Sequence, residues 1–305
     1  QLASAISQGR SGTTSRLAIG GRALVTMLTL GSLFATNAWD VPAYAALVLI
    51  SIFMATSRLP VFSLRIIVTL IGATSTAIGA FILFQPFFSH YVTLFGSLEQ
   101  TRSKTDIAQF SVHLGGFLTI IALGLITYSI TRRHSPRLAG YADPAIFVLY
   151  FGGLLIIDFL NLGDSTFVRT VLIVSVIAVL TFTMLNASVS DGDVRWRTPR
   201  MMTIGLGGIA ATLFAIQGDL TLALTIAFTI AGVMLWFSAH NQAMKFTGAL
   251  IAAGSAIGAG VEVVFLADDL AGDPVWYRMN TIFKFYNQIW TFFAISAAVL
   301  LTMMI

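Results

Sequence analysis

The chain consists of long apolar runs separated by short polar loops. A helix needs about 20 apolar residues to cross a bilayer, and the runs come close to that length. The pattern therefore predicts an all-α fold, a polytopic transmembrane bundle of about ten helices. The predicted spans are residues 17–36, 41–57, 64–88, 109–131, 144–161, 166–187, 201–217, 219–239, 246–266 and 282–305.

Composition supports the membrane assignment. Of the 305 residues, 57% are hydrophobic and only 10% are charged, whereas soluble domains carry about 25% charged residues. The pI near 9.6 does not indicate nucleic-acid binding, because the basic residues are spread along short loops between apolar runs. The chain has no cysteine, which excludes disulfides and cysteine-based metal sites.

The charges predict an orientation in which the chain start is cytoplasmic, in the plasma membrane of a prokaryote. All but five of the 17 basic residues then lie inside, as the positive-inside rule requires. The five outside are Arg102, Lys104, Arg169, Arg278 and Lys284. Most acidic residues fall outside or in the outer ends of spans, which indicates either a solvated surface or a polar site there.

The two chain ends look like cuts in a longer protein. The sequence begins at Gln1 without a methionine and stops inside an apolar run. No segment resembles a separate soluble domain. We expect residues 1–305 to form a single transmembrane domain, the carboxy-terminal part of a longer chain.

A first polar constellation lies in the outer turn between the first two spans. Asp40 can cap the second helix, with Pro42 in its first turn. Trp39 and Tyr44 suit a membrane-interface belt. The functional alternative is that Asp40 and Asn37 face an outer cavity and bind a polar substrate or a metal.

A second constellation, residues 273–290, is the densest polar and aromatic stretch and enters the last span from outside. Its polar residues at helical spacing share one face; they are Asn280, Lys284, Asn287 and Gln288. Such a face should meet a cavity or other helices, since lipid cannot satisfy it. With Arg278, this cationic stripe suits an anion such as a lipid-linked phosphate. Snorkelling of the two cations to headgroups is the alternative, but it does not explain the amides.

Two acids near the outer ends of apolar spans, Asp158 and Glu262, form a third candidate. Ionisable residues within spans are functional hypotheses by default. The alternative is an ion pair with Arg278, Lys284 or Arg169. No histidine cluster has metal-ligand spacing, and a divalent metal held by acids alone stays open as a cofactor.

The string Arg278-Met-Asn-Thr-Ile-Phe-Lys-Phe-Tyr, together with Asn37-Ala-Trp39-Asp40, resembles the YYY family of multi-pass membrane proteins, known from Chloroflexi and archaea. That family is largely uncharacterised and is similar to the GT-C class of membrane glycosyltransferases. The resemblance implies a polyprenyl-phosphate sugar donor on the outer face. It further implies that Arg278 and Lys284 hold the phosphate and that Asp40 is the catalytic acid.

One element of the family pattern, a Gly-Asp-x-His-Pro-His string, does not occur in this sequence. A chain that truly lacks this region would be inactive as it stands, and a longer chain would carry its acid upstream. The leading hypothesis is therefore a GT-C-like glycosyltransferase. The alternative is a non-catalytic accessory or scaffold subunit of a larger membrane complex, with membrane lipids and other membrane subunits as partners. A transporter ranks third, because neither repeats nor helices broken at the midplane are evident.

Overall fold

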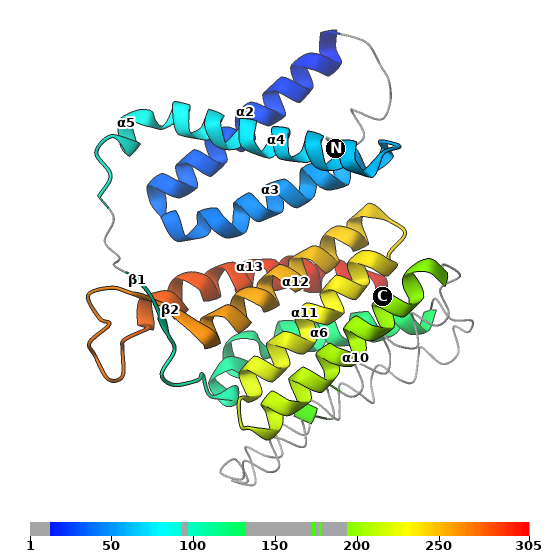
Figure 1. Cartoon of the computed structure of the whole chain (residues 1–305), viewed down its shortest axis with the longest axis vertical. Coiled ribbons are helices and arrows are strands. Elements are labelled where there is room, and N and C mark those ends of the chain that lie inside the picture. The colour runs from blue at the N-terminus through cyan, green and yellow to red at the C-terminus, as the bar shows by residue number, and fades with distance from the viewer. Residues whose placement is uncertain (1–12, 93–96, 132–172, 175–176, 178–193, 305) are drawn as a thin grey trace. The chain divides into compact units, whose positions relative to one another are not determined.

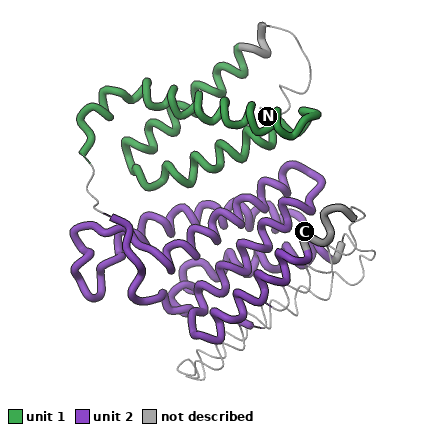
Figure 2. Tube along the Cα trace, viewed as in Figure 1, with its two compact units in different colours: residues 1–95 green, residues 96–305 purple. Residues whose placement is uncertain are grey.

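The computed structural model describes residues 13–92, 97–131, 173–174, 177 and 194–304 (Figure 1). These residues are mostly helical, which confirms the all-α membrane bundle. In the described part, seven helices are long and apolar enough to cross a membrane, and a shorter apolar helix covers Met201–Ile216. The chain divides into two compact units, residues 1–95 and 96–305 (Figure 2).

Unit 1 is a group of three long helices joined by tight turns. Its elements are α2 (Thr13–Thr36), η1 (Ala38–Asp40), α3 (Val41–Ala55), η2 (Thr56–Arg58), α4 (Phe62–Leu83) and α5 (Gln85–Phe88). Pro42 lies in the first turn of α3, as expected, where proline costs no hydrogen bond. The predicted span 64–88 is divided after Leu83, so that α5 begins one residue before Pro86.

Unit 2 is a helix bundle with one short sheet. Its elements are β1 (Ser97–Gln100), α6 (Ile107–Thr131), α10 (Val194–Ile216), α11 (Leu220–Ser238), α12 (Gln242–Val263), β2 (Val264–Ala267) and α13 (Met279–Met304). Gly218, with φ +92°, makes the tight turn between α10 and α11. The helices α11 and α12 pack so closely that a Cβ at Gly232 would lie 2.5 Å from the backbone nitrogen of Ala252.

The sheet was not predicted from the sequence. β1 and β2 pair antiparallel, from Ser97 opposite Ala267 to Gln100 opposite Val264. The predicted span 246–266 therefore ends early as a helix, because its last residues continue as a strand. This pairing ties the loop before α6 to the end of α12.

Eight of the ten predicted spans coincide with described helices or parts of them. The remaining two, 144–161 and 166–187, lie outside the described residues apart from three positions. Six of the described helices begin before their predicted spans, among them α10 at Val194 and α13 at Met279. The early start of α13 makes the whole predicted polar stripe helical.

Candidate functional site

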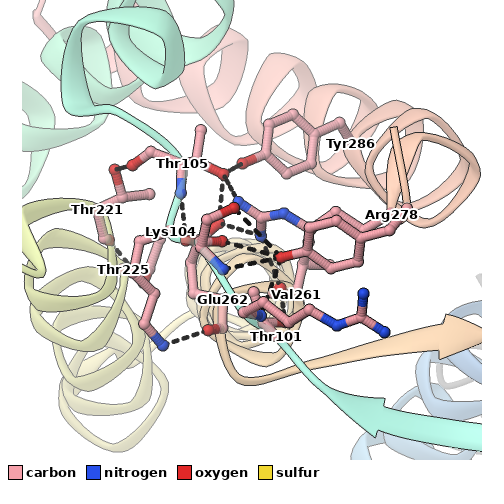
Figure 3. A network of polar contacts seen from close by, with 12 residues as sticks. Thr101, Lys104, Thr105, Thr221, Thr225, Val261, Glu262, Arg278 and Tyr286 are labelled. Atoms are coloured by element: carbon pink, nitrogen blue, oxygen red, sulfur yellow. Dashed lines mark hydrogen bonds and ion pairs between the residues drawn. The ribbon is translucent and has the colours of Figure 1, made fainter. Parts of the chain in front are cut away.

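Four helices meet at one end of unit 2 around Thr105, which lies in the loop between β1 and α6 (Figure 3). Glu262 reaches it from the last turn of α12, and Arg278 directly precedes α13. Thr221, in the first turn of α11, donates to the Thr105 carbonyl at 2.8 Å. The starts of α6, α11 and α13 are thus joined to the end of α12 through one residue.

Every polar atom of Thr105 takes part in a hydrogen bond. Its backbone N–H donates to Oε2 of Glu262 at 2.7 Å, and its hydroxyl donates to Oε1 at 2.5 Å. The same hydroxyl oxygen accepts from Nη2 of Arg278 at 3.1 Å and from the hydroxyl of Tyr286 at 3.4 Å. A threonine hydroxyl has one donor and two acceptor positions, so its capacity is fully used.

Glu262 and Arg278 form a buried ion pair at the carboxyl end of α12. Nη1 of Arg278 lies 3.3 Å from Oε1 of Glu262, and the two side chains are 7% and 0% exposed. A carboxylate is unfavourable at the negative end of a helix dipole. Two cations offset it: Arg278 also donates to the Val261 carbonyl at 3.1 Å, and Lys104 donates to the Glu262 carbonyl at 2.6 Å. The ion-pair alternative for Glu262 and Arg278 is therefore confirmed.

Tyr277 fixes the loop that carries Lys104. Its hydroxyl oxygen accepts the backbone N–H groups of Arg102 and Ser103, both at 2.9 Å, and its ring is buried against Phe265. Burial alone would raise the pKa of Tyr277, but the hydrogen bonds from Ser103 and Arg102 outweigh it and lower the pKa. Lys104 is consequently an exposed cation on a fixed backbone.

The polar stripe on α13 lies on one helix, as predicted, but its members differ in environment. Asn280 donates to Oδ2 of Asp268 at 2.8 Å, which ties the start of α13 to the loop after β2. Lys284 is half-buried, Asn287 is exposed and Gln288 is buried. The stripe thus contacts the loop after β2 through Asn280, the bundle interior through Gln288 and the surface of unit 2 through Asn287.

The comparisons with known proteins yield one family. The family described as "Uncharacterized membrane protein (DUF2298)" matches residues 2–293. This chain belongs to the DUF2298 family. No curated protein and no solved structure matches the chain. Both the family membership and the membrane-length helices indicate that this chain is an integral membrane protein. The closer resemblance to the YYY family and the GT-C class stays a prediction.

In this DUF2298 protein the first constellation belongs to unit 1. Asn37 precedes η1, which contains Trp39 and Asp40. Asp40 occupies the N-cap position of α3, as expected, but its side chain makes no capping hydrogen bond. A metal site was left open by the sequence, and among the described residues no group of three or more histidines and acids could hold one. Asp158 lies outside the described residues.

The main residues that the sequence analysis missed are Thr105, Lys104, Tyr277 and Tyr286. Thr105 and Lys104 belong to a loop whose partners lie more than 110 residues away in the sequence. Tyr277 and Tyr286 lie inside the polar and aromatic stretch 273–290, but the sequence analysis assigned no role to either. The one usable signal was the basic character of Lys104 on the side where basic residues are scarce.

Proposed function

We propose that this protein is a GT-C-like glycosyltransferase that uses a polyprenyl-phosphate-linked sugar on the non-cytoplasmic face of a prokaryotic plasma membrane. The observation that supports this most is the position of the cations. Arg278 and Lys104 converge on the end of α12, where α6, α11 and α13 begin. The partially positive amino ends of three helices and two cations suit a phosphate group.

The cations differ in the role that each can take. Arg278 already donates to Val261, Glu262 and Thr105, so it sets the local charge and geometry. Lys104 is exposed, and its ammonium group has two N–H donors beyond the one bonded to Glu262. Lys284, half-buried one turn into α13, is the second proposed phosphate contact.

In the proposed reaction, a hydroxyl oxygen of the acceptor attacks the anomeric carbon of the donor sugar. The bond between that carbon and the phosphate oxygen breaks, and the polyprenyl phosphate leaves with the bonding electrons. The acceptor proton passes to a carboxylate base. The cations stabilise the charge on the departing phosphate.

The remaining polar residues are proposed to orient the donor sugar. The set comprises Asn280, Asn287 and Gln288 of unit 2, with Asp158, outside the described residues, as a further proposed contact. Asn37, Trp39 and Asp40 belong to unit 1 and are proposed separately as contacts for a polar substrate. Asn280 is held in place by its hydrogen bond to Asp268. Glu262 is fully buried, and its carboxylate positions Thr105 and Arg278.

The experiment measures transfer of labelled sugar from a polyprenyl-phosphate donor in membranes that contain the full-length protein. Lys104→Ala and Lys284→Ala should each lower transfer by about 10²-fold or more, because each removes charge stabilisation of the leaving group. Lys245→Ala is the matched control, because Lys245 lies in the first turn of α12, at the opposite end from Glu262. Full activity in the Lys104→Ala, Lys284→Ala double variant refutes the phosphate contact.

The second candidate function is an accessory subunit of a larger membrane complex. It is favoured by the closed hydrogen bonding of the cluster: the hydroxyl and N–H of Thr105 are fully used, and the Glu262 carboxylate is fully buried. A cluster of this kind can serve purely to fix the helices. Stable co-purification with other membrane subunits, together with absence of transfer, supports this function over the first.

A further inference from the structure

The turn between α3 and α4 in unit 1 contains two arginines that the proposed function does not use. Arg58 ends η2 and is exposed. Arg65 lies in the first turn of α4 and is half-buried. Both are on the predicted cytoplasmic side, away from η1 at the other end of α3.

Among the described residues, Arg65 is held in place without a carboxylate. Its guanidinium carbon lies 4.3 Å from the centre of the Phe53 ring, and Nη2 donates to the Phe53 carbonyl at 3.4 Å. The Nε atom is buried and has no acceptor among the described residues. A guanidinium has five N–H donors, so one weak hydrogen bond and one ring leave most of its binding capacity unused.

The surroundings of Arg65 contain no negative charge from the same part of the sequence. Between Asp40 and Glu99 the chain has no acidic residue. Asp40 lies at the far end of α3, which at 15 residues is about 22 Å long. Arg65 also stands at the positive end of the α4 dipole, where an anion is favoured and a cation is not.

The same turn presents apolar side chains. Val61, Phe62 and Leu64 are 52%, 63% and 41% exposed. The segments on both sides, Ala38–Arg58 and Phe62–Leu83, are long and apolar enough to cross a membrane. The arginines therefore lie at a bilayer boundary, where the phosphates of lipid headgroups are found.

We propose that the α3–α4 turn is a binding site for the phosphate of an anionic phospholipid, with Arg65 as the fixed contact and Arg58 as the outer one. Phe53 holds the Arg65 guanidinium in position, and Phe62 and Val61 contact the acyl region. The anionic lipids of the cytoplasmic leaflet are the ligands that this charge and polarity fit. The site does not depend on glycosyl transfer, since none of the residues proposed for that reaction lies in the α3–α4 turn.

The test uses the full-length protein in lipid nanodiscs with phosphatidylglycerol or with phosphatidylcholine alone. Native mass spectrometry counts the lipids that stay bound after detergent washing. We expect the wild type to retain phosphatidylglycerol, and Arg65→Gln to bind it about five- to tenfold more weakly, the effect of one basic group at a membrane surface. Lys245→Gln is the matched control, because it removes a cation on the same predicted side.

Equal losses in Arg65→Gln and Lys245→Gln, or no preference for phosphatidylglycerol in the wild type, overturn the proposal. Displacement of the lipid by an excess of inorganic phosphate also overturns it, because a free anion is then the ligand. If Arg65→Gln does not fold, Arg58→Gln is measured in its place, since Arg58 is exposed and its substitution should not prevent folding. Retention of phosphatidylglycerol at the wild-type level by Arg58→Gln then counts against the site.

Discussion

Removal of Arg278 should destabilise the protein far more than removal of an exposed arginine. Arg278→Met keeps most of the side-chain volume but leaves the Glu262 carboxylate, which is 0% exposed, without a cation. Breaking a buried pair by removing one partner costs about 3–5 kcal/mol. The variant also loses the hydrogen bonds from Arg278 to Val261 and Thr105, so we expect the upper part of that range.

Glu262→Gln tests the other half of the pair. An amide at this position can still accept from Thr105, but it carries no charge to balance Arg278. We expect a smaller loss, about 2–3 kcal/mol, because Arg278 retains its bonds to Val261 and Thr105. In the double variant no unpaired charge remains, so its loss should fall short of the sum of the two single losses by about 2 kcal/mol or more.

The assay is reversible unfolding in mixed micelles, followed by circular dichroism, with the free energy of unfolding compared among the four proteins. Arg102→Met is the control, because Arg102 is 53% exposed and its pair with Glu99 is solvated. Such a pair contributes about 0–1 kcal/mol. Additive losses in the double variant would show that Glu262 and Arg278 do not interact, and would refute the assignment of the cluster.

Three further predictions follow. Thr105→Val should lower the free energy of unfolding by about 3 kcal/mol, because the Glu262 carboxylate loses the hydrogen bond from the Thr105 hydroxyl. Unfolding in mixed micelles measures this loss. Gly232→Ala should cost about 1–3 kcal/mol by forcing α11 from α12, whereas Gly205→Ala, with open space around it, should not. The backbone N–H groups of Trp276 and Val275 donate to the Asp273 carboxylate and lower its pKa. The turn should therefore persist above pH 3.8 and open as the pH falls through the lowered pKa. The chemical shift of the Trp276 amide, followed against pH in the wild type and in Asp273→Asn, measures this opening.

The helices of the bundle could be predicted because each is an apolar run of membrane length, a property of consecutive residues. The ends of the helices were harder to predict from the sequence. The segment after Val263 is as apolar as the helix before it, and it becomes a strand because Val264 to Ala267 find partners in Ser97 to Gln100. That partner lies more than 160 residues away, so no local pattern could indicate it.

The candidate site shows the same division. Glu262 was recognised because a charge near the end of an apolar run is unfavourable and indicates a specific role. Arg278 was recognised because basic residues are scarce on the predicted outer side. Thr105, which joins them, is an uncharged residue in a polar loop, where threonine is common and gives no signal. Its importance arises from the meeting of three helix starts with one helix end, which is a property of the folded chain.

The cluster has features of both a structural tie and a binding site, and the difference between them lies in Lys104. The interactions of Glu262, Arg278 and Thr105 are directed at one another, so they would persist in a protein without a ligand. Lys104 is different, because only one N–H of its ammonium group donates to the Glu262 carbonyl at the end of α12, and the Lys104 side chain stays exposed. A helix tie alone would not require a cation there, since a neutral donor can cap a carbonyl. Lys104→Gln keeps a donor and removes the charge, so stability should fall by only about 0.3–1 kcal/mol, the contribution of an exposed cation at a helix C-terminus. Loss of sugar transfer in this variant would support phosphate binding by Lys104, whereas unchanged transfer would support a purely structural tie.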